Sequence, residues 1–380
     1  MSLPISISCV AAFGLMILSA RGQTASATTS PVGAVSLGAF NTSTSAYIGL
    51  QSGSDTFVTL PLTRPPVFVG TTSAAPTGST IPISGAPGWT TNQFVYASGS
   101  QTNTYYVLIG SNSTTSNPKE GCLYTITGND ASDLTIDLGG DTITSIPAGT
   151  TLTIIPFWTL GTLFPASNVN VSFTPTTLTR SLQTEVLVPD NSSAGINRAY
   201  ANIYIYVKSG SNVGWRNTSD PTLSIDQSNV PFVPNSFFVV RNNSGTPSGQ
   251  FVLTGNVLTG NVATPLMTQT SGGQDNDVAM IRPIGVTLAN CGLNTADGSF
   301  VPTVATRSLK DELFLYDNNV AQINKPPSTI YIYAEGMWQN TATIGTNSNT
   351  DMLPAGAAIM IRKAATTTGS SVFWTNSPTY

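Results

Sequence analysis

Residues 179–206 read TRSLQTEVLVPDNSSAGINRAYANIYIY, and residues 306–333 read TRSLKDELFLYDNNVAQINKPPSTIYIY. The two stretches align without a gap, because every matched pair is separated by 127 positions (306 − 179 = 127). Both end on Ile-Tyr-Ile-Tyr, and such alternation within a run of β-branched and aromatic residues predicts a β-strand. The chain is therefore predicted to contain one β-module twice in its C-terminal half.

The similarity continues beyond these stretches through small deletions. Residues 215–217 (WRN) match 338–340 (WQN), and residues 238–241 (FVVR) match 359–362 (IMIR). Fainter similarity relates 147–155 to 354–361, and 54–58 to the residues around 276–278. In each copy the Ile-Tyr-Ile-Tyr strand is followed, after a Gly-containing turn, by a Trp, and this pattern indicates a hairpin.

Short alternating segments separated by Gly, Pro and Asn turns fill the rest of the chain. We predict an all-β fold of several β-sandwich or β-barrel-like modules with little helix. The predicted ranges are a signal peptide at 1–22, a flexible leader at 23–45, an N-terminal β-domain at 46–155 and two related modules at 156–281 and 282–380. The modules could each fold alone or interleave their strands.

The composition excludes several classes of function. Charged residues make up only 8% of the chain, against roughly 25% in ordinary globular proteins, so Ser, Thr, Asn and Gln must cover the surface. With 14 basic residues against 18 acidic ones, nucleic-acid binding is disfavoured. The chain has no His, which removes the commonest general base and zinc ligand and disfavours an enzyme.

The N-terminal segment predicts secretion. Residues 5–19 form an apolar run that is too short for a stable transmembrane helix, and the small residues Ala20 and Gly22 stand at positions −3 and −1 of a cleavage site after Gly22. Residues 25–27 (ASA) offer a second cleavage site, and a buried N-terminal helix is the alternative interpretation. The usual basic residue before the apolar run is missing. We expect a secreted, extracellular or cell-surface protein with no transmembrane helix in the mature chain, and the periplasm is the alternative location.

Several long motifs carry a resemblance to a known family. They are PLTRP at 61–65, GWTTNQFV at 88–95, FWTLGTLFP at 157–165, the repeated Ile-Tyr-Ile-Tyr and Trp blocks, and IRKAA at 361–365. Through them nearly all of the mature chain resembles an uncharacterised family of secreted proteins found mainly in Verrucomicrobia-type bacteria. The resemblance implies a signal peptide and paralogous copies, and it supplies no activity and no catalytic residue.

The repeated aromatic residues are the candidate binding residues. Alternation puts the two Ile side chains of each strand on one face, expected to be core, and the two Tyr side chains on the other. Simple hairpin stabilisation is the favoured interpretation, and stacking on sugars or on a partner is the alternative. The residues are Tyr204, Tyr206, Trp215, Tyr331, Tyr333 and Trp338.

Charges shared by both copies stand out in a chain with so few. We interpret them as ion pairs that hold strands in register, for example Arg241 with Asp190. The alternative is a glycoside hydrolase that uses Glu185 with Asp190, and the matching pair in the second copy, as two carboxyls across a cleft. The residues are Arg180, Glu185, Asp190 and Arg241 in the first copy and Arg307, Glu312, Asp317 and Arg362 in the second.

Two cysteines, Cys122 and Cys291, remain after signal removal. They could form a disulfide in an oxidising compartment, although two buried thiols are favoured. Acidic turns around Asp130–Asp141 and Asp275–Asp277 raise the alternative of a structural Ca²⁺ ion, but their spacing matches no calcium loop and Asp favours turns in any case. No other cofactor is expected.

Taken together, these features predict a structural or adhesive protein that acts through β-module surfaces and self-associates. A neutral face rich in hydroxyl and amide groups can pack against copies of itself or against cell-envelope polysaccharide without complementary charge. The alternatives are a carbohydrate-binding module protein and, less favoured, a carboxylate-dependent glycan hydrolase.

Overall fold

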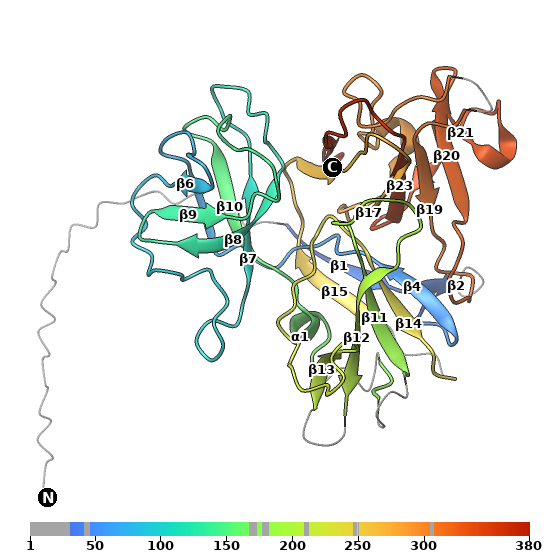
Figure 1. The fold of residues 1–380 in the computed structure, drawn as a ribbon, viewed down its shortest axis with the longest axis horizontal. Helices are drawn as coiled ribbons and strands as arrows, with labels where there is room; N and C mark the ends of the chain where they lie inside the picture. Colours follow the sequence, from blue (N-terminus) through green and yellow to red (C-terminus); the bar gives the residue numbers. More distant parts are fainter. Residues whose placement is uncertain are drawn as a thin grey trace, which may run out of the picture. The chain divides into compact units, whose positions relative to one another are not determined.

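The computed structural model describes residues 31–41, 46–166, 173–176, 182–208, 213–245, 249, 251–304 and 308–380. The predicted signal peptide, Arg180 and Arg307 lie outside these ranges. The fold is all-β, as predicted, with strands joined by turns (Figure 1). Among the described residues, helix is confined to α1 (Leu160–Leu163) and two 3-10 turns, η1 (Leu288–Asn290) and η2 (Thr341–Thr343). Within the described ranges, no helix is long and apolar enough to cross a membrane.

One antiparallel sheet contains six strands, all between residues 68 and 156. Its inner strands bury a compact apolar cluster that includes Val107, Ile109, Leu134 and Ile154. From edge to edge the order is β5 (Phe68–Thr71), β10 (Thr151–Pro156), β7 (Tyr105–Ile109), β8 (Leu123–Asn129), β9 (Asp133–Ile136) and β6 (Thr80–Pro82). This sheet occupies most of the range predicted as the N-terminal β-domain.

Two five-stranded sheets contain the strands of the repeated stretches, and their strands follow the same order. The first sheet runs β13 (Gly214–Asn217), β12 (Tyr200–Val207), β11 (Thr184–Pro189), β14 (Phe238–Asn242) and β4 (Ser54–Val58). The second runs β21 (Met337–Asn340), β20 (Thr329–Ala334), β19 (Glu312–Leu315), β23 (Ala358–Lys363) and β17 (Gln274–Ala279). Neighbouring strands in both sheets are antiparallel.

The edge strands β4 and β17 come from outside the ranges of the modules whose sheets they join. Strand β4 lies in the range 46–155, yet it pairs with β14, and β17 lies in the range 156–281, yet it pairs with β23. The six-stranded sheet is inserted in the chain between β4 and β11. The ranges therefore interleave their strands, which was the alternative that the sequence left open.

The expectation of a flexible leader up to residue 45 does not hold for residues 32–41. Strand β1 (Val32–Leu37) pairs with β15 (Phe251–Asn256), and β2 (Ala39–Asn41) pairs with β3 (Ala46–Gly49). Val35 packs against the core of the first five-stranded sheet. The small side chains of this segment give no strand pattern in the sequence. Its order comes from backbone pairing with β15.

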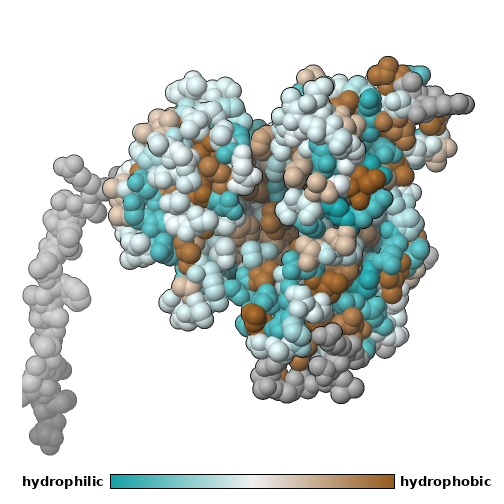
Figure 2. Space-filling model, viewed as in Figure 1, coloured by the Kyte–Doolittle hydropathy of each residue, from teal (hydrophilic) through white to brown (hydrophobic). Residues whose placement is uncertain are grey.

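Two further pairs complete the fold, β16 (Val262–Leu266) with β24 (Val372–Asn376) and β18 (Val286–Thr287) with β22 (Met352–Leu353). On the face drawn in Figure 2, apolar residues form small patches scattered among neutral and hydrophilic ones. This is the surface expected from a chain in which only 8% of the residues are charged.

Candidate functional site: two interlocked sheet edges and a cavity

Each five-stranded sheet carries a row of three charged residues across neighbouring strands. In the first sheet Arg241 lies opposite Asp55 on one side and opposite Glu185 on the other. Its guanidinium donates from Nε to Asp55 Oδ1 at 2.7 Å and from Nη2 to Asp55 Oδ2 at 2.9 Å. This two-point contact is the geometry in which an Arg and a carboxylate bind most strongly.

The second sheet repeats the arrangement with Asp275, Arg362 and Glu312. Arg362 donates from Nε to Asp275 Oδ1 at 2.7 Å and from Nη2 to Oδ2 at 3.0 Å. Burial raises the pKa of Glu312, partly offset by the charge of Arg362. Two of the predicted charges, Arg241 and Arg362, therefore form ion pairs across neighbouring strands, but their partners Asp55 and Asp275 are not among the predicted charges.

The predicted pairing of Arg241 with Asp190 is wrong. Asp190 instead begins the loop after β11, where its Oδ1 accepts hydrogen bonds from the backbone N–H groups of Ser192 at 2.9 Å and Ser193 at 3.1 Å. Hydrogen bonds from the Ser193 and Ser192 hydroxyls lower the pKa of Asp190. Asp317 starts the matching loop and accepts from the N–H of Asn319 at 2.8 Å. A carboxylate that closes its own turn is a common local role for Asp.

Each of these loops reaches across to the edge strand of the other sheet. Asn324, after β19, donates its backbone N–H to Asp55 Oδ2 at 2.7 Å and accepts from Arg241 Nη2 at 2.6 Å. Asn197, after β11, makes the same contacts with Asp275 at 2.7 Å and with Arg362 at 3.0 Å. Both asparagines have positive φ, 51° and 53°, a conformation that Asn adopts more readily than most residues.

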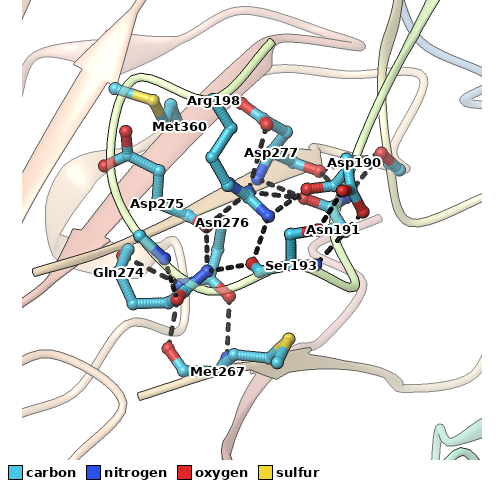
Figure 3. Close-up of polar contacts among 12 residues, drawn as sticks. Asp190, Asn191, Ser193, Arg198, Met267, Gln274, Asp275, Asn276, Asp277 and Met360 are labelled. Atoms are coloured by element: carbon cyan, nitrogen blue, oxygen red, sulfur yellow. Dashed lines mark hydrogen bonds and ion pairs between the residues drawn. The ribbon is translucent and has the colours of Figure 1, made fainter. Parts of the chain in front are cut away.

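A second asparagine in each loop binds the backbone of that edge strand. Asn318 accepts from Phe57 N at 2.8 Å and donates to Phe57 O at 2.8 Å. Asn191 accepts from Asp277 N at 3.0 Å and donates to Asp277 O at 2.8 Å (Figure 3). Backbone bonds from Asp55 N to Gln322 O and from Asp275 N to Gly195 O complete the contact. Exposed edges invite pairing with other chains, and here each sheet's loop covers the other's edge. We call this reciprocal contact the interlock.

A cavity of about 310 Å³ lies where the two sheets meet. Its lining includes Asp55, Arg198, Asp277 and Lys325. Arg198 Nη2 lies 3.4 Å from Asp277 Oδ2 and also donates to the backbone oxygen of Asp275 at 2.6 Å. Burial raises the pKa of Asp277 to about 6, against the lowering effect of Arg198, and burial lowers the pKa of Lys325 to about 8. Opposed shifts in one cavity are a feature of functional sites, although ion pairs within the fold also produce them.

The candidate aromatic residues are placed differently from the expectation. Tyr204, Tyr206 and Trp215 belong to the core of the first sheet, with Trp215 only 1% exposed. Tyr331 and Trp338 are buried in the equivalent core of the second sheet, and Tyr333 is half-buried against it. The Tyr face, not the Ile face, therefore turns to the main core, and these six residues form no exposed flat strip.

Cross-strand contacts explain the burial of these rings. Tyr206 lies opposite Trp215 and Tyr333 opposite Trp338, each pair edge to face with ring centres 5.5 Å and 5.6 Å apart. Trp215 Nε1 donates to the backbone oxygen of Phe164 at 3.1 Å, so its polar atom is satisfied within the core. Large rings with satisfied polar atoms fill a core well, which favours the hairpin-stabilising role.

Cys122 and Cys291 are free, buried thiols in separate apolar clusters, so they form no disulfide.

In the acidic turn near residue 130, Asp130 accepts from the N–H groups of Ser132 and Asp133, both at 2.8 Å. Across the part of the chain that the structure describes, no group of three acidic or cysteine side chains could hold a metal ion.

Comparison of the chain with protein-family models, with curated proteins and with solved structures gave no match. The resemblance to a secreted Verrucomicrobial family therefore stays a prediction. The residues that build the interlock were visible in the sequence only as asparagines repeated at the 127-residue offset, Asn191 with Asn318 and Asn197 with Asn324.

Proposed function

We propose that this chain is a secreted or cell-surface structural or adhesive protein that acts through the surfaces of its β-modules and self-associates. We further propose that its two five-stranded sheets are copies of one module, because strand order, charged row and interlocking loop recur in both. Residues 1–22 are proposed as the signal peptide that exports the chain. The family resemblance fits this proposal.

The single observation that carries the proposal is the interlock. Two of the charges shared by both copies join neighbouring strands: Arg241 binds Asp55, and Arg362 binds Asp275. Some charges stay exposed, such as Asp137 and Lys310, but charged residues are only 8% of the chain, so neutral groups dominate the composition of the surface and suit packing against a like surface. Charges used in this way hold the fold together, and this use fits a structural role.

The hydrolase alternative gains no support from its predicted residues. Glu185 is buried in β11, opposite Arg241, and accepts a hydrogen bond from Asn243 at 2.6 Å. Its proposed partner Asp190 closes the exposed turn that follows the strand. The two carboxyl groups therefore do not face each other across a cleft, as a pair of glycosidase acids must.

An edge of the six-stranded sheet is a candidate contact between copies. Strand β5 is an edge strand of this sheet. Val69, within β5, is 66% exposed, and Val67, just before β5, is 51% exposed. Exposed apolar residues on an edge strand favour pairing with another chain. The interlock, by contrast, already covers the edges β4 and β17.

The test is the assembly state of the mature chain, measured by light scattering after size-exclusion chromatography, together with fractionation of the native host. We expect oligomers in solution and protein in the secreted or envelope fraction. Val69→Lys should weaken the assembly, and Val252→Lys, an exposed valine on β15, should not. A mature chain that stays monomeric at all concentrations and is found in the cytosol would overturn the proposal.

A further inference from the structure

The cavity at the interlock has one wall of aromatic rings. Phe57 stacks on Tyr316 with ring centres 4.1 Å apart, and Phe237 meets Phe57 edge to face at 5.4 Å. Phe57 comes from β4 of the first sheet, and Tyr316 follows β19 of the second. The Tyr316 hydroxyl has only a weak contact, 3.9 Å to the sulfur of Met360, so it can bond to a guest.

The polar lining holds hydrogen-bonding capacity that the protein does not use. Arg198 is 8% exposed, and within the described residues its Nε has no hydrogen-bond partner, although its other nitrogens are well bonded (Figure 3). Lys325 Nζ donates only to the backbone oxygens of Asp317 and Asn318, at 3.3 Å and 3.4 Å. Asp277 is held by Arg198 through a single 3.4 Å contact, which leaves acceptor sites on its carboxylate.

An unpartnered buried donor is costly, at about 1–3 kcal/mol, and is rarely left so without a ligand or water. Arg198 Nε is too deeply buried to be reached from the cavity, but a spare donor on Lys325 lies in the same cavity as a spare acceptor on Asp277 and the hydroxyl of Tyr316. The guest that completes these bonds must therefore both donate and accept. Water can fill the same role, and a ligand would have to displace it.

The charges in the lining balance. Three carboxylates (Asp55, Asp275, Asp277) stand against three cations (Arg198, Lys325, Arg362), and three minus three leaves no net charge. A charged guest would meet as much repulsion as attraction, and it would also lose its hydration on entry. The balance favours a neutral guest.

We propose that this cavity binds a neutral polyol the size of a monosaccharide. Sugar hydroxyls both donate and accept, and the C–H groups of a pyranose pack against aromatic rings such as the half-buried Tyr316, one face of which Phe57 already covers. A volume of about 310 Å³ lies at the small end of ligand sites, about 300–1,000 Å³. This site is separate from the module surfaces of the proposed function and does not depend on self-association.

The experiment is saturation-transfer NMR on the full mature chain with the methyl glycosides of glucose, galactose, mannose and N-acetylglucosamine. Glucuronate and glucosamine serve as the anionic and cationic analogues. Two variants alter the cavity: Tyr316→Phe removes one hydroxyl and keeps the stacked ring, and Asp277→Asn removes one charge. Their matched controls are Tyr96→Phe and Asp137→Asn, at exposed residues outside the cavity. Thermal melting checks that each variant is folded.

We expect at least one neutral glycoside to bind, and Tyr316→Phe and Asp277→Asn each to weaken that binding about tenfold, as loss of one well-placed hydrogen bond does. The two control variants should bind like the unaltered protein. The proposal is overturned if no neutral glycoside binds, if a charged analogue binds more tightly than every neutral one, or if folded cavity variants retain full binding.

Discussion

Arg241 and Arg362 each hold a carboxylate that is almost entirely buried; Asp55 is 1% exposed and Asp275 is 2% exposed at the side chain. A buried charge that loses its partner is strongly destabilising, whereas the intact pair contributes little beyond what an apolar pair would. These arginines therefore stabilise the fold mainly because their loss would leave the buried carboxylates of Asp55 and Asp275 without a counter-charge.

Arg241→Met should lower the free energy of unfolding by about 3–5 kcal/mol, because Asp55 stays buried without its counter-charge. Urea unfolding followed by tryptophan fluorescence measures the change. The double variant Arg241→Met, Asp55→Asn removes both charges and should recover part of the loss. An equal loss in single and double variants would show that lost packing, not the unpaired charge, is responsible.

The protonation of Asp277 makes the stability of the protein depend on pH. Burial raises the pKa of Asp277 to about 6, above its ordinary value of 3.8, so the folded state binds this proton more strongly than the unfolded state. Its stabilising effect is complete below pH 3.8 and is lost as pH rises through about 6. Asp277→Asn should therefore gain stability relative to the unaltered protein across that window.

Urea unfolding at several pH values measures this gain, which we expect to reach about 2–3 kcal/mol above pH 6 at most. Asp137→Asn provides the comparison, because Asp137 is exposed and accepts only from the N–H of Gly139 among the described residues. A difference between Asp277→Asn and the unaltered protein that does not change with pH would contradict the raised pKa.

At the scale of the element, the loops after β11 and β19 act as covers for the edge strands β17 and β4. Each cover depends on one asparagine, Asn191 for β17 and Asn318 for β4. Its side-chain amide donates to and accepts from the backbone of a single residue of the edge strand, as a neighbouring strand would. Removing it leaves a backbone N–H and a backbone C=O of the edge strand without partners.

Asn318→Ala should expose the amide of Phe57 to hydrogen exchange and leave the amide of Asp277 protected, and Asn191→Ala should do the reverse. Each variant is the control for the other, because the two loops make matching contacts. Hydrogen exchange followed by NMR or mass spectrometry measures the effect. Loss of protection at both edges in either variant would mean that the two covers are not independent.

At the scale of the whole molecule, the described residues from Pro31 to Tyr380 form one compact unit. The chain passes from β4 through the six-stranded sheet before it returns to β11, and long-range contacts such as Asn324 with Asp55 tie distant segments together. Stability is thus carried by interlocked sheets and well-filled cores, without a disulfide between Cys122 and Cys291.

Both thiols should stay unmodified by a thiol reagent in the native mature chain and react fully in denaturant. Burial raises the pKa of each thiol to about 11, so little reactive thiolate forms at neutral pH. Mass spectrometry after alkylation, without a reductant, counts the modified cysteines. Detection of a pair that cannot be alkylated in denaturant would reveal a disulfide and contradict the structure.

The sequence by itself determined the strand-rich class, the repeated hairpins and the scarcity of charge, because alternation and composition are local properties of the chain. Only the tertiary structure decided that β4 and β17 complete sheets outside their predicted ranges, since strands pair through backbone groups that every residue carries. The tertiary structure also decided the role of Asp55 and Asp275. In the sequence they resemble ordinary turn-forming acids, and only the pairing of the strands places Arg241 and Arg362 opposite them. The same holds for the Tyr side chains of the repeated strands, because alternation assigns two faces but does not say which one is covered.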